Sequence, residues 1–413
     1  MSNKSLMTVL KVLGPVILPI LFGMCLTSIN VLCNIPVHHN STESRLDQLN
    51  YWKLVSPALF IGTFTLSLVI FISGMYRIVP HPYFKYIFTT SAICICISNI
   101  LFIYIRNNIL LSICRYIIGI GTGIACALGP VYYTDLLGMV NGSKVSSLQG
   151  LFINLGILIE GVISGYYNNS TFIFKVISGI SFISIIINIL FTENSKKQNN
   201  LRIIRASGDV NVITRHNPKL LIISCLIMQV VQQMTGINPI LSNRNGFFMD
   251  INTVPAYFFN MAGLIGTTLS SIIMFNGNGF KEIVFISGII CTVTLGILGF
   301  SNVLWCSGIY LLFFSLGLAN LPWILPGMLL QEESDITTAA GLGSLANSAV
   351  SCIALSMFTK YKVIDGSDGI NWVFFVFSTF SFIEGVFGYF LVRVSERQNK
   401  KSSGVEMKEL LST

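Results

Sequence analysis

The sequence predicts an all-α integral membrane protein with twelve transmembrane helices. Of its 413 residues, 53% are hydrophobic and only 10% are charged, whereas soluble domains carry about 25% charged residues. Apolar runs of about 20 residues, the length that crosses a hydrocarbon layer about 30 Å thick, follow one another along the chain. One long polar stretch divides these runs into two sets of six. This pattern excludes a soluble enzyme, a disordered scaffold and a disulfide-stapled secreted domain.

Each expected helix is an apolar run with few charged residues. The first six runs are 8–33, 53–75, 85–105, 109–134, 145–166 and 171–192. The second six are 219–241, 254–275, 282–301, 304–329, 337–359 and 371–393. We interpret the first run as a retained helix because it is long and lacks a small-residue cleavage site.

The polar break sets the expected domain organisation. We predict an N-terminal six-helix bundle at 1–192, a cytosolic linker loop at 193–218, a C-terminal six-helix bundle at 219–396 and a short cytosolic tail at 397–413. Most of the 25 Lys and Arg residues fall on the side of the linker and of both termini. The positive-inside rule therefore predicts that both termini are cytosolic. This topology places the loop 35–51 outside, where the sequon at Asn40 is a candidate glycosylation site.

Other functional classes find little support in the sequence. The net charge of +8 comes from basic residues spread over the whole chain, so no nucleic-acid-binding face is expected. Most of the ten cysteines lie in apolar runs, and no histidine pair has ligand spacing, so no metal site is expected. We find no GxxxxGK phosphate loop and no catalytic arrangement around the four histidines. The chain is therefore predicted to be neither an enzyme nor nucleotide-dependent, to have no cofactor and no catalytic residue, and to contact the lipid bilayer.

The seventh run carries the strongest functional signal, the segment QVVQQMTGINP. Gln229, Gln232 and Gln233 recur at helical spacing, which puts three carboxamides on one face at membrane depth. A carboxamide in hydrocarbon needs hydrogen-bond partners, so this face is expected to line a wet cavity. Pro239 disfavours a helical conformation at Asn238 and predicts a break there. Carboxamides both donate and accept, which suits a neutral polyhydroxylated ligand; the alternative is hydrogen bonding between helices.

The segment from Gln232 to Asn238 resembles the QQxxGIN motif of the sugar porter branch of the major facilitator superfamily. Further resemblance extends over about 20–396, in short motifs of the first, fourth, fifth and tenth helices. These motifs are Phe22-Gly23 with Ile29-Asn30, Arg115 to Asp135 with the intervening glycines, Leu155 to Leu158, and Pro322-Trp323. The resemblance implies the major facilitator fold, with two bundles that rock around a central site. It also implies transport of a monosaccharide, with glucose as the first candidate.

The same resemblance assigns roles to individual residues. Gln232, Gln233 and Asn238 would contact sugar hydroxyls, and Trp323 would pack against the sugar and the gate. Helical spacing adds weaker cavity candidates: Asn30 shares a face with Gly23 and Thr27, Gln149 and Glu160 share one with Gly156, and Asn260 lies one turn before Leu264. Asn347 is a further weaker candidate. Several family positions are substituted: the tenth-helix acid falls on Ser315 and the eighth-helix asparagine on Leu264.

Structural and gating roles are expected elsewhere. Gly119 and Gly123 stand four residues apart, a spacing that lets transmembrane helices approach closely. Arg115 either extends toward the membrane surface or, by resemblance, braces the bundle together with Asp135. Pro322 and Pro326 predict an irregular tenth helix.

The coupling mechanism stays open at this point. Proton-coupled members of the family carry an aspartate in the first helix, and its absence here favours facilitated diffusion. Glu160, an acid within the fifth run, is a functional candidate; it could contact sugar hydroxyls, couple a proton or form a structural pair. Carriers of another solute and a non-transporting sugar receptor are the remaining alternatives, although about 20 residues after the last run are few for signalling. We expect the plasma membrane as the location.

Overall fold

The computed structural model describes twelve stretches of the chain. They are residues 3–28, 42–76, 83–105, 107–137, 139–167, 170–193, 217–242, 257–276, 279–300, 304–330, 332–364 and 372–412. All regular structure within these stretches is helical. Eleven helices there are long and apolar enough to cross a membrane, and a twelfth apolar helix covers Phe259–Phe275. The expected all-α architecture with twelve spans is therefore confirmed.

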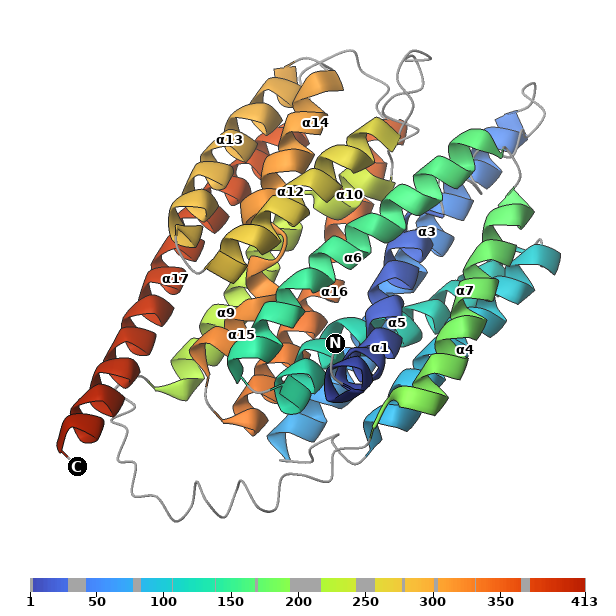
Figure 1. Cartoon of the computed structure of the whole chain (residues 1–413). Coiled ribbons are helices and arrows are strands. Elements are labelled where there is room, and N and C mark those ends of the chain that lie inside the picture. Colours follow the sequence, from blue (N-terminus) through green and yellow to red (C-terminus); the bar gives the residue numbers. More distant parts are fainter. Residues whose placement is uncertain are drawn as a thin grey trace.

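The N-terminal half consists of six helices that are each continuous (Figure 1, blue to green). They are α1 (Asn3–Thr27), α3 (Thr42–Met75), α4 (Phe84–Tyr104), α5 (Asn108–Leu137), α6 (Met139–Tyr166) and α7 (Ser170–Phe191). An unpaired backbone group is costly in hydrocarbon, so apolar spans satisfy their own backbone as helices. Glycines allow close crossings: a Cβ on Gly62 would collide with the Tyr116 carbonyl, and one on Gly119 with the Leu59 carbonyl. The backbones of α3 and α5 thus touch directly.

The C-terminal half contains the remaining six spans, two of which are interrupted (Figure 1, yellow-green to red). Its elements are α9 (Pro218–Met234), α10 (Ile237–Ser242), α12 (Tyr257–Asn276), α13 (Phe280–Phe300), α14 (Leu304–Phe313), η2 (Phe314–Leu318), α15 (Leu321–Leu329), α16 (Glu333–Ile364) and α17 (Trp372–Ser412). The seventh span is α9 followed by α10, and the tenth span is α14, η2 and α15.

The seventh span breaks at Thr235 and Gly236, not at Asn238 as predicted. Gly236 has a φ of 82°, a left-handed conformation that glycine adopts without steric cost. The Tyr310 hydroxyl donates to the Thr235 carbonyl over 3.1 Å, so a backbone acceptor at the break is paired. Pro239 lies inside α10, where its missing N–H is tolerated near the start of a helix. The glycine, rather than the proline, therefore sets the break.

The tenth span loosens into a π-helix before it breaks. The amide of Ala319 donates to the Phe314 carbonyl over 2.8 Å, the five-residue step that defines a π turn. Asn320 follows, and α15 then starts with Pro322 in its first turn. Pro322 and Pro326 thus lie in a short separate helix.

Two helices are longer than the sequence predicts. Helix α3 starts at Thr42, so residues 42–51 of the expected outer loop are helical. Helix α17 continues to Ser412, so residues 397–412 of the expected tail are helical (Figure 1). Both stretches are polar, and because we delimited the spans as apolar runs, the sequence does not predict these extensions. Asn30 and Asn40 lie outside the described residues.

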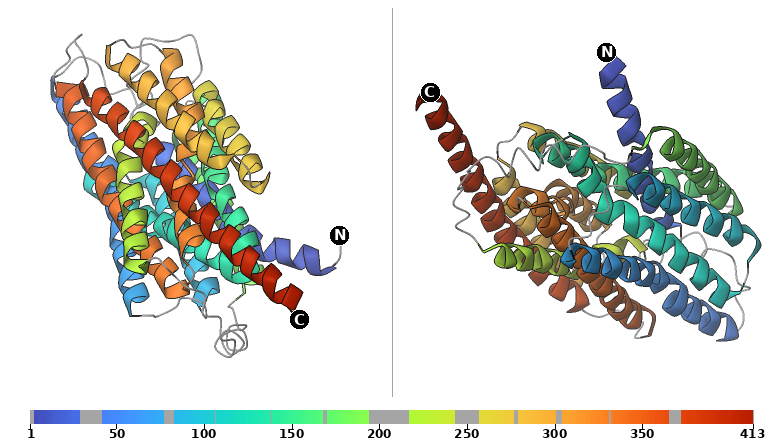
Figure 2. Two further views of the ribbon diagram at one scale, coloured as in Figure 1. Left: turned by 90° about the vertical axis from the view of Figure 1, so that its left-hand side faces the viewer. Right: turned by 90° about the horizontal axis from the view of Figure 1, so that it is seen from below.

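The two halves meet along α3 with α16 and along α6 with α12, and they lie side by side when seen from below (Figure 2, right). Hydroxyl groups connect α3 to α16: the oxygens of Thr63 and Ser348 are 2.7 Å apart, and those of Ser67 and Ser344 are 2.8 Å apart. We call these two pairs the hydroxyl seam. Helix α3 belongs to the N-terminal half and α16 to the C-terminal half, so the seam joins the halves through side chains.

Charged groups pair at one end of each half. Lys11 lies 2.9 Å from Glu193, and Lys281 lies 2.6 Å from Glu396. Both acids come at or near the ends of the sixth and twelfth spans. The two halves therefore use matching ion pairs at the side on which α7 ends and α9 starts (Figure 1).

Candidate functional site

A cavity of about 120 Å³ lies between the two halves. This space holds several water molecules, because one water needs about 10–15 Å³ measured in the same way. Side chains from both halves line it, and thirteen of them are Ser, Thr, Asn, Gln or Trp: Thr63, Ser146, Gln149, Asn154, Gln232, Gln233, Asn238, Ser315, Asn320, Trp323, Ser344, Asn347 and Ser348. A polar wall in a membrane-spanning chain marks a hydrated space.

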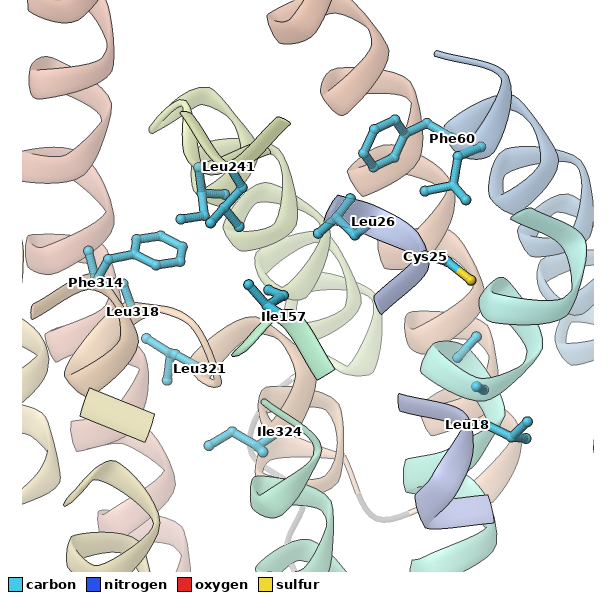
Figure 3. Packing of buried hydrophobic residues seen from close by; sticks show 14 of the residues in the cluster. Leu18, Cys25, Leu26, Phe60, Ile157, Leu241, Phe314, Leu318, Leu321 and Ile324 are labelled. Atoms are coloured by element: carbon cyan, nitrogen blue, oxygen red, sulfur yellow. The ribbon is translucent and has the colours of Figure 1, made fainter. Parts of the chain in front are cut away.

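Apolar side chains complete the wall. Figure 3 shows Leu241 and Phe314 of the C-terminal half across from Leu26 and Phe60 of the N-terminal half, with Ile157 between them. All five are buried. Apolar surface with a few placed polar groups is typical of small-molecule sites.

The break of the seventh span brings Gln233 and Asn238 together. Asn238 donates through Nδ2 to Gln233 Oε1 over 2.6 Å and to Ser351 Oγ over 2.9 Å. Ser351 Oγ is also 2.9 Å from Gln233 Oε1. Three polar groups from α9, α10 and α16 thus form one network. The Nε2 of Gln233 takes no part in these bonds, and Gln233 lies on the cavity wall.

Gln232 joins the two interrupted spans. Its Nε2 donates to the carbonyls of Leu318 and Ala319, over 3.0 and 2.9 Å. Both carbonyls lie at the π turn of the tenth span, where regular helical partners are lost. Gln232 therefore satisfies the break in the neighbouring span while lining the cavity.

Gln229 and Asn347 form a third polar contact, in which Asn347 Nδ2 donates to Gln229 Oε1 over 2.7 Å. Asn347 lines the main cavity. Gln229 lines a second, smaller hollow of about 30 Å³. Trp323 belongs to the walls of both. Pro322 and Pro326 line the smaller hollow beside it.

Helix α6 supplies the N-terminal side of the polar wall. Gln149 is 3% exposed and donates through Nε2 to the Cys126 carbonyl over 3.2 Å. Asn154 donates to the Gly150 carbonyl one turn earlier, over 3.0 Å. Both line the cavity.

Two of the weaker candidates lie elsewhere. Glu160 is fully buried in α6, and the cavity wall formed by the described residues does not include it. Asn260 donates to the Ile157 carbonyl over 3.1 Å, which ties α12 to α6, and it is also absent from that wall. Face assignments from helical spacing alone placed both on the cavity side.

The residues with expected structural roles in the N-terminal half all lie on α5. Arg115 is 2% exposed and donates to the carbonyls of Cys25 and Leu26, over 2.8 and 3.3 Å. It therefore fixes the end of α1 instead of extending to the membrane surface. Gly119 and Gly123 pack against α3, and Asp135 is half-buried near the end of α5.

Sequence reasoning missed Asn154, Asn320 and Ser351. Asn320 directly precedes the Leu-Pro-Trp segment, and its place before a predicted break was an available signal. Ser351 lies four residues after Asn347, which puts both on one face of α16. Asn154 had no comparable signal, because its position depends on how α6 meets α12.

No family model matches this chain. Curated relatives include the facilitated trehalose transporter Tret1 of Drosophila willistoni, 24% identical over 374 residues, covering 77% of this chain and 42% of the relative. Tret1 of Drosophila erecta is 27% identical over 218 residues, 48% of this chain and 25% of the relative. The Tret1-2 homolog of Drosophila sechellia is 24% identical over 371 residues, which cover 77% of this chain and 75% of the relative. The chain spans less than half the length of the first two.

Solved structures share the fold. The proton:xylose symporter XylE bound to 6-bromo-6-deoxy-D-glucose matches with a TM-score of 0.74 and 16% identity, covering 94% of this chain and 96% of that one. XylE from E. coli in a partially occluded inward-open conformation matches with a TM-score of 0.70, covering 92% and 96%.

These similarities give the chain its class. It has the major facilitator fold of a multi-pass integral membrane protein, and the curated relatives that it matches at 24–27% identity are named as facilitated trehalose transporters. The proteins compared are named as transporters and not as enzymes, in agreement with the sequence-based expectation.

Proposed function

We propose that this major facilitator chain carries a sugar across a membrane by alternating access. The observation that carries the proposal is the carboxamide wall of the cavity between the halves, with Gln233 and Asn238 held by Ser351. A preformed wall of amide donors and acceptors matches the paired donor and acceptor character of sugar hydroxyls. The proposed contacts are Gln232, Gln233, Asn238, Trp323, Gln149 and Asn347.

The geometry supports motion of one half against the other. The halves 1–192 and 219–396, joined by the linker 193–218, are the proposed moving bodies. They touch along α3 with α16 and along α6 with α12. Arg115, Gly119 and Gly123 would keep the N-terminal half rigid, while Pro322 and Pro326 border the proposed gate beside Trp323.

A hexose, with D-glucose first, is the proposed substrate. Trehalose is the second candidate, because several sequence relatives are named as facilitated trehalose transporters. The two sugars present the same kind of hydroxyl groups and differ in size. Transport assays with both separate the candidates.

Facilitated diffusion is the proposed mode. Among the described residues that line the cavity there is no aspartate or glutamate, which favours a carrier that does not couple a proton at the site. The alternative is proton coupling through Glu160, which is buried in α6. A protonophore that abolishes accumulation would support this alternative. The plasma membrane is the proposed location.

Uptake into proteoliposomes tests the function directly. The purified full-length chain should give saturable uptake of labelled D-glucose or trehalose, without a proton gradient and with equal rates in both directions at equilibrium exchange. Labelled L-glucose and protein-free liposomes are the controls. Saturable uptake of another class of solute, with none of any sugar, would overturn the proposal.

A further inference from the structure

Asn320 lies at the junction between the π-helix η2 and α15. It is 4% exposed and lines the cavity. It precedes α15 as the N-cap residue, with φ −86° and ψ −23°, but its side chain makes no capping hydrogen bond. The commonest structural use of an asparagine at a helix start is thus absent here.

The amide nitrogen of Asn320 is distinctive among the buried asparagines. Its Nδ2 is enclosed and donates to no acceptor within the described residues. Each of the other buried asparagines there donates through Nδ2 to a protein acceptor: Asn99, Asn188, Asn238, Asn260 and Asn347. Buried donors are nearly always paired, so this one points to an acceptor supplied from the cavity.

The opposite wall leaves room for this side chain. A Cβ on Gly150 of α6 would collide with Asn320 Oδ1. The carboxamide of the C-terminal half therefore packs on the backbone of the N-terminal half. The residue before that glycine, Gln149, lines the same cavity, and its Oε1 is buried without a hydrogen-bond donor in the described residues. A donor and an acceptor thus belong to adjoining parts of the wall, one from each half.

We propose that Asn320 is a further substrate contact, whose Nδ2 donates to the oxygen of a sugar hydroxyl, with Gly150 required to admit its side chain. The inference rests on the proposed sugar transport. A hydroxyl is the matching group because it accepts from Asn320 and retains a proton to donate, for example to Gln149. The contact lies where the two halves meet, so the substrate itself would complete the hydrogen bonding there.

Analogue competition in proteoliposomes tests this contact. The labelled sugar is D-glucose, or trehalose if the wild type takes up only that, and the competitors are its single deoxy and deoxyfluoro derivatives. At one position the deoxy sugar should compete about tenfold less well than the parent, the effect of one lost hydrogen bond. The fluoro sugar should compete better than the deoxy sugar there, since fluorine accepts but does not donate. In Asn320→Ala this discrimination should disappear at that position alone.

Two further variants separate binding from packing. Gly150→Ala should remove the same discrimination, because the added Cβ displaces the carboxamide. Asn188→Ala is the matched control: Asn188 also packs its carboxamide against a glycine, Gly14, but its Nδ2 is paired and it lies in α7, away from the cavity. It should keep the wild-type pattern of discrimination.

The outcomes are distinct. Equal discrimination in Asn320→Ala and wild type, or equal weakening of every analogue, would overturn the contact while leaving sugar transport intact. If the wild type takes up neither sugar, the proposed function fails and this inference fails with it.

Discussion

The first and fourth helices of the two halves contain prolines, yet only those of the C-terminal half are interrupted. Helix α1 includes Pro15 and Pro19 and is continuous over 25 residues. Helix α5 includes Pro130 and is continuous over 30 residues. Their counterparts by order in the chain, α9 with α10 and α14 with η2 and α15, are broken. Proline alone therefore does not determine where a transmembrane helix breaks in this protein.

Compensating polar groups make the difference. In the C-terminal half, Gln232 donates hydrogen bonds to the carbonyls of Leu318 and Ala319, and Tyr310 donates one to the carbonyl of Thr235. In the N-terminal half, Arg115 of α5 donates to two carbonyls at the end of α1. Within its span, α1 packs on α6 through glycine, with Gly23 against Ile153 and Gly156 against Ile20. A break within a membrane is tolerated where neighbouring side chains pair the freed groups. The C-terminal half thus places two interrupted helices with paired polar groups opposite the continuous helices of the N-terminal half.

The largest effect should come from closing the break in the seventh span. Gly236→Ala places a side chain at φ 82° and against the ring of Phe377. Left-handed strain of about 1–2 kcal/mol and overpacking of about 1–3 kcal/mol should together cost about 3 kcal/mol of unfolding free energy. The midpoint of unfolding in detergent measures it, and uptake should be lost as well.

Gly279 provides the control for this change. It has a similar φ of 79°, and a Cβ there would meet no atom within 4 Å. Gly279→Ala should therefore show the backbone strain alone and keep transport. Equal losses in the two variants would mean that the packing of the break against Phe377 contributes nothing.

A smaller but more specific effect is expected at the binding wall. Gln233→Leu removes the acceptor shared by Asn238 and Ser351, leaving both polar groups short of a partner in the cavity. We expect sugar uptake to fall about 100-fold, since sites built to pair a ligand's polar groups discriminate strongly when a partner is lost. Thermal stability should change little compared with Gly236→Ala. Wild-type uptake in Gln233→Leu would remove this residue from the site.

In the N-terminal half, a substitution at a helix crossing should lower the free energy of unfolding. A Cβ on Gly119 would collide with the Leu59 carbonyl of α3, so Gly119→Ala should cost about 2 kcal/mol by overpacking. Gly179 of α7 meets no atom within 4 Å, and Gly179→Ala should be neutral. Detergent unfolding midpoints compare the two. The apparent KM for sugar should stay constant in both variants, because neither residue lines the cavity. A raised KM in Gly119→Ala would contradict this division between residues that pack helices and residues that bind.

Much of this division could be predicted from the sequence, and the exceptions have physical reasons. The apolar runs define the spans, and the carboxamides at 229, 232 and 233 identify the polar face, because hydrocarbon leaves few alternatives for either pattern. The sequence predicts the break at Asn238 because the effect of Pro239 on the residue before it can be read from the sequence. The actual break at Gly236 depends on how Phe377 and Tyr310 pack around it, which the sequence does not give. Helical spacing predicts which residues share a face with Glu160, but it does not show which helix packs against that face. The sequence therefore places Glu160 at the cavity, whereas the structure buries it elsewhere.

The seam between the halves offers the smallest and most direct test of the comparison. Each of its hydroxyl pairs, Thr63 with Ser348 and Ser67 with Ser344, joins one helix of each half. Interhelical hydrogen bonds in membranes contribute about 0.6 kcal/mol on average. A double-mutant cycle of Ser67→Ala and Ser344→Ala, measured by detergent unfolding, should give a coupling of about that size.

The control for the seam is Ser178→Ala, which removes a hydroxyl that bonds only within its own helix, to Phe174 over 2.7 Å. It should leave both stability and transport close to wild type. The seam variants should instead change the uptake rate more than the unfolding midpoint, because a weak bond between moving bodies biases their equilibrium while adding little to the stability of either. If unfolding changes and uptake does not, α3 and α16 do not separate during transport, and the moving boundary lies along α6 and α12 instead.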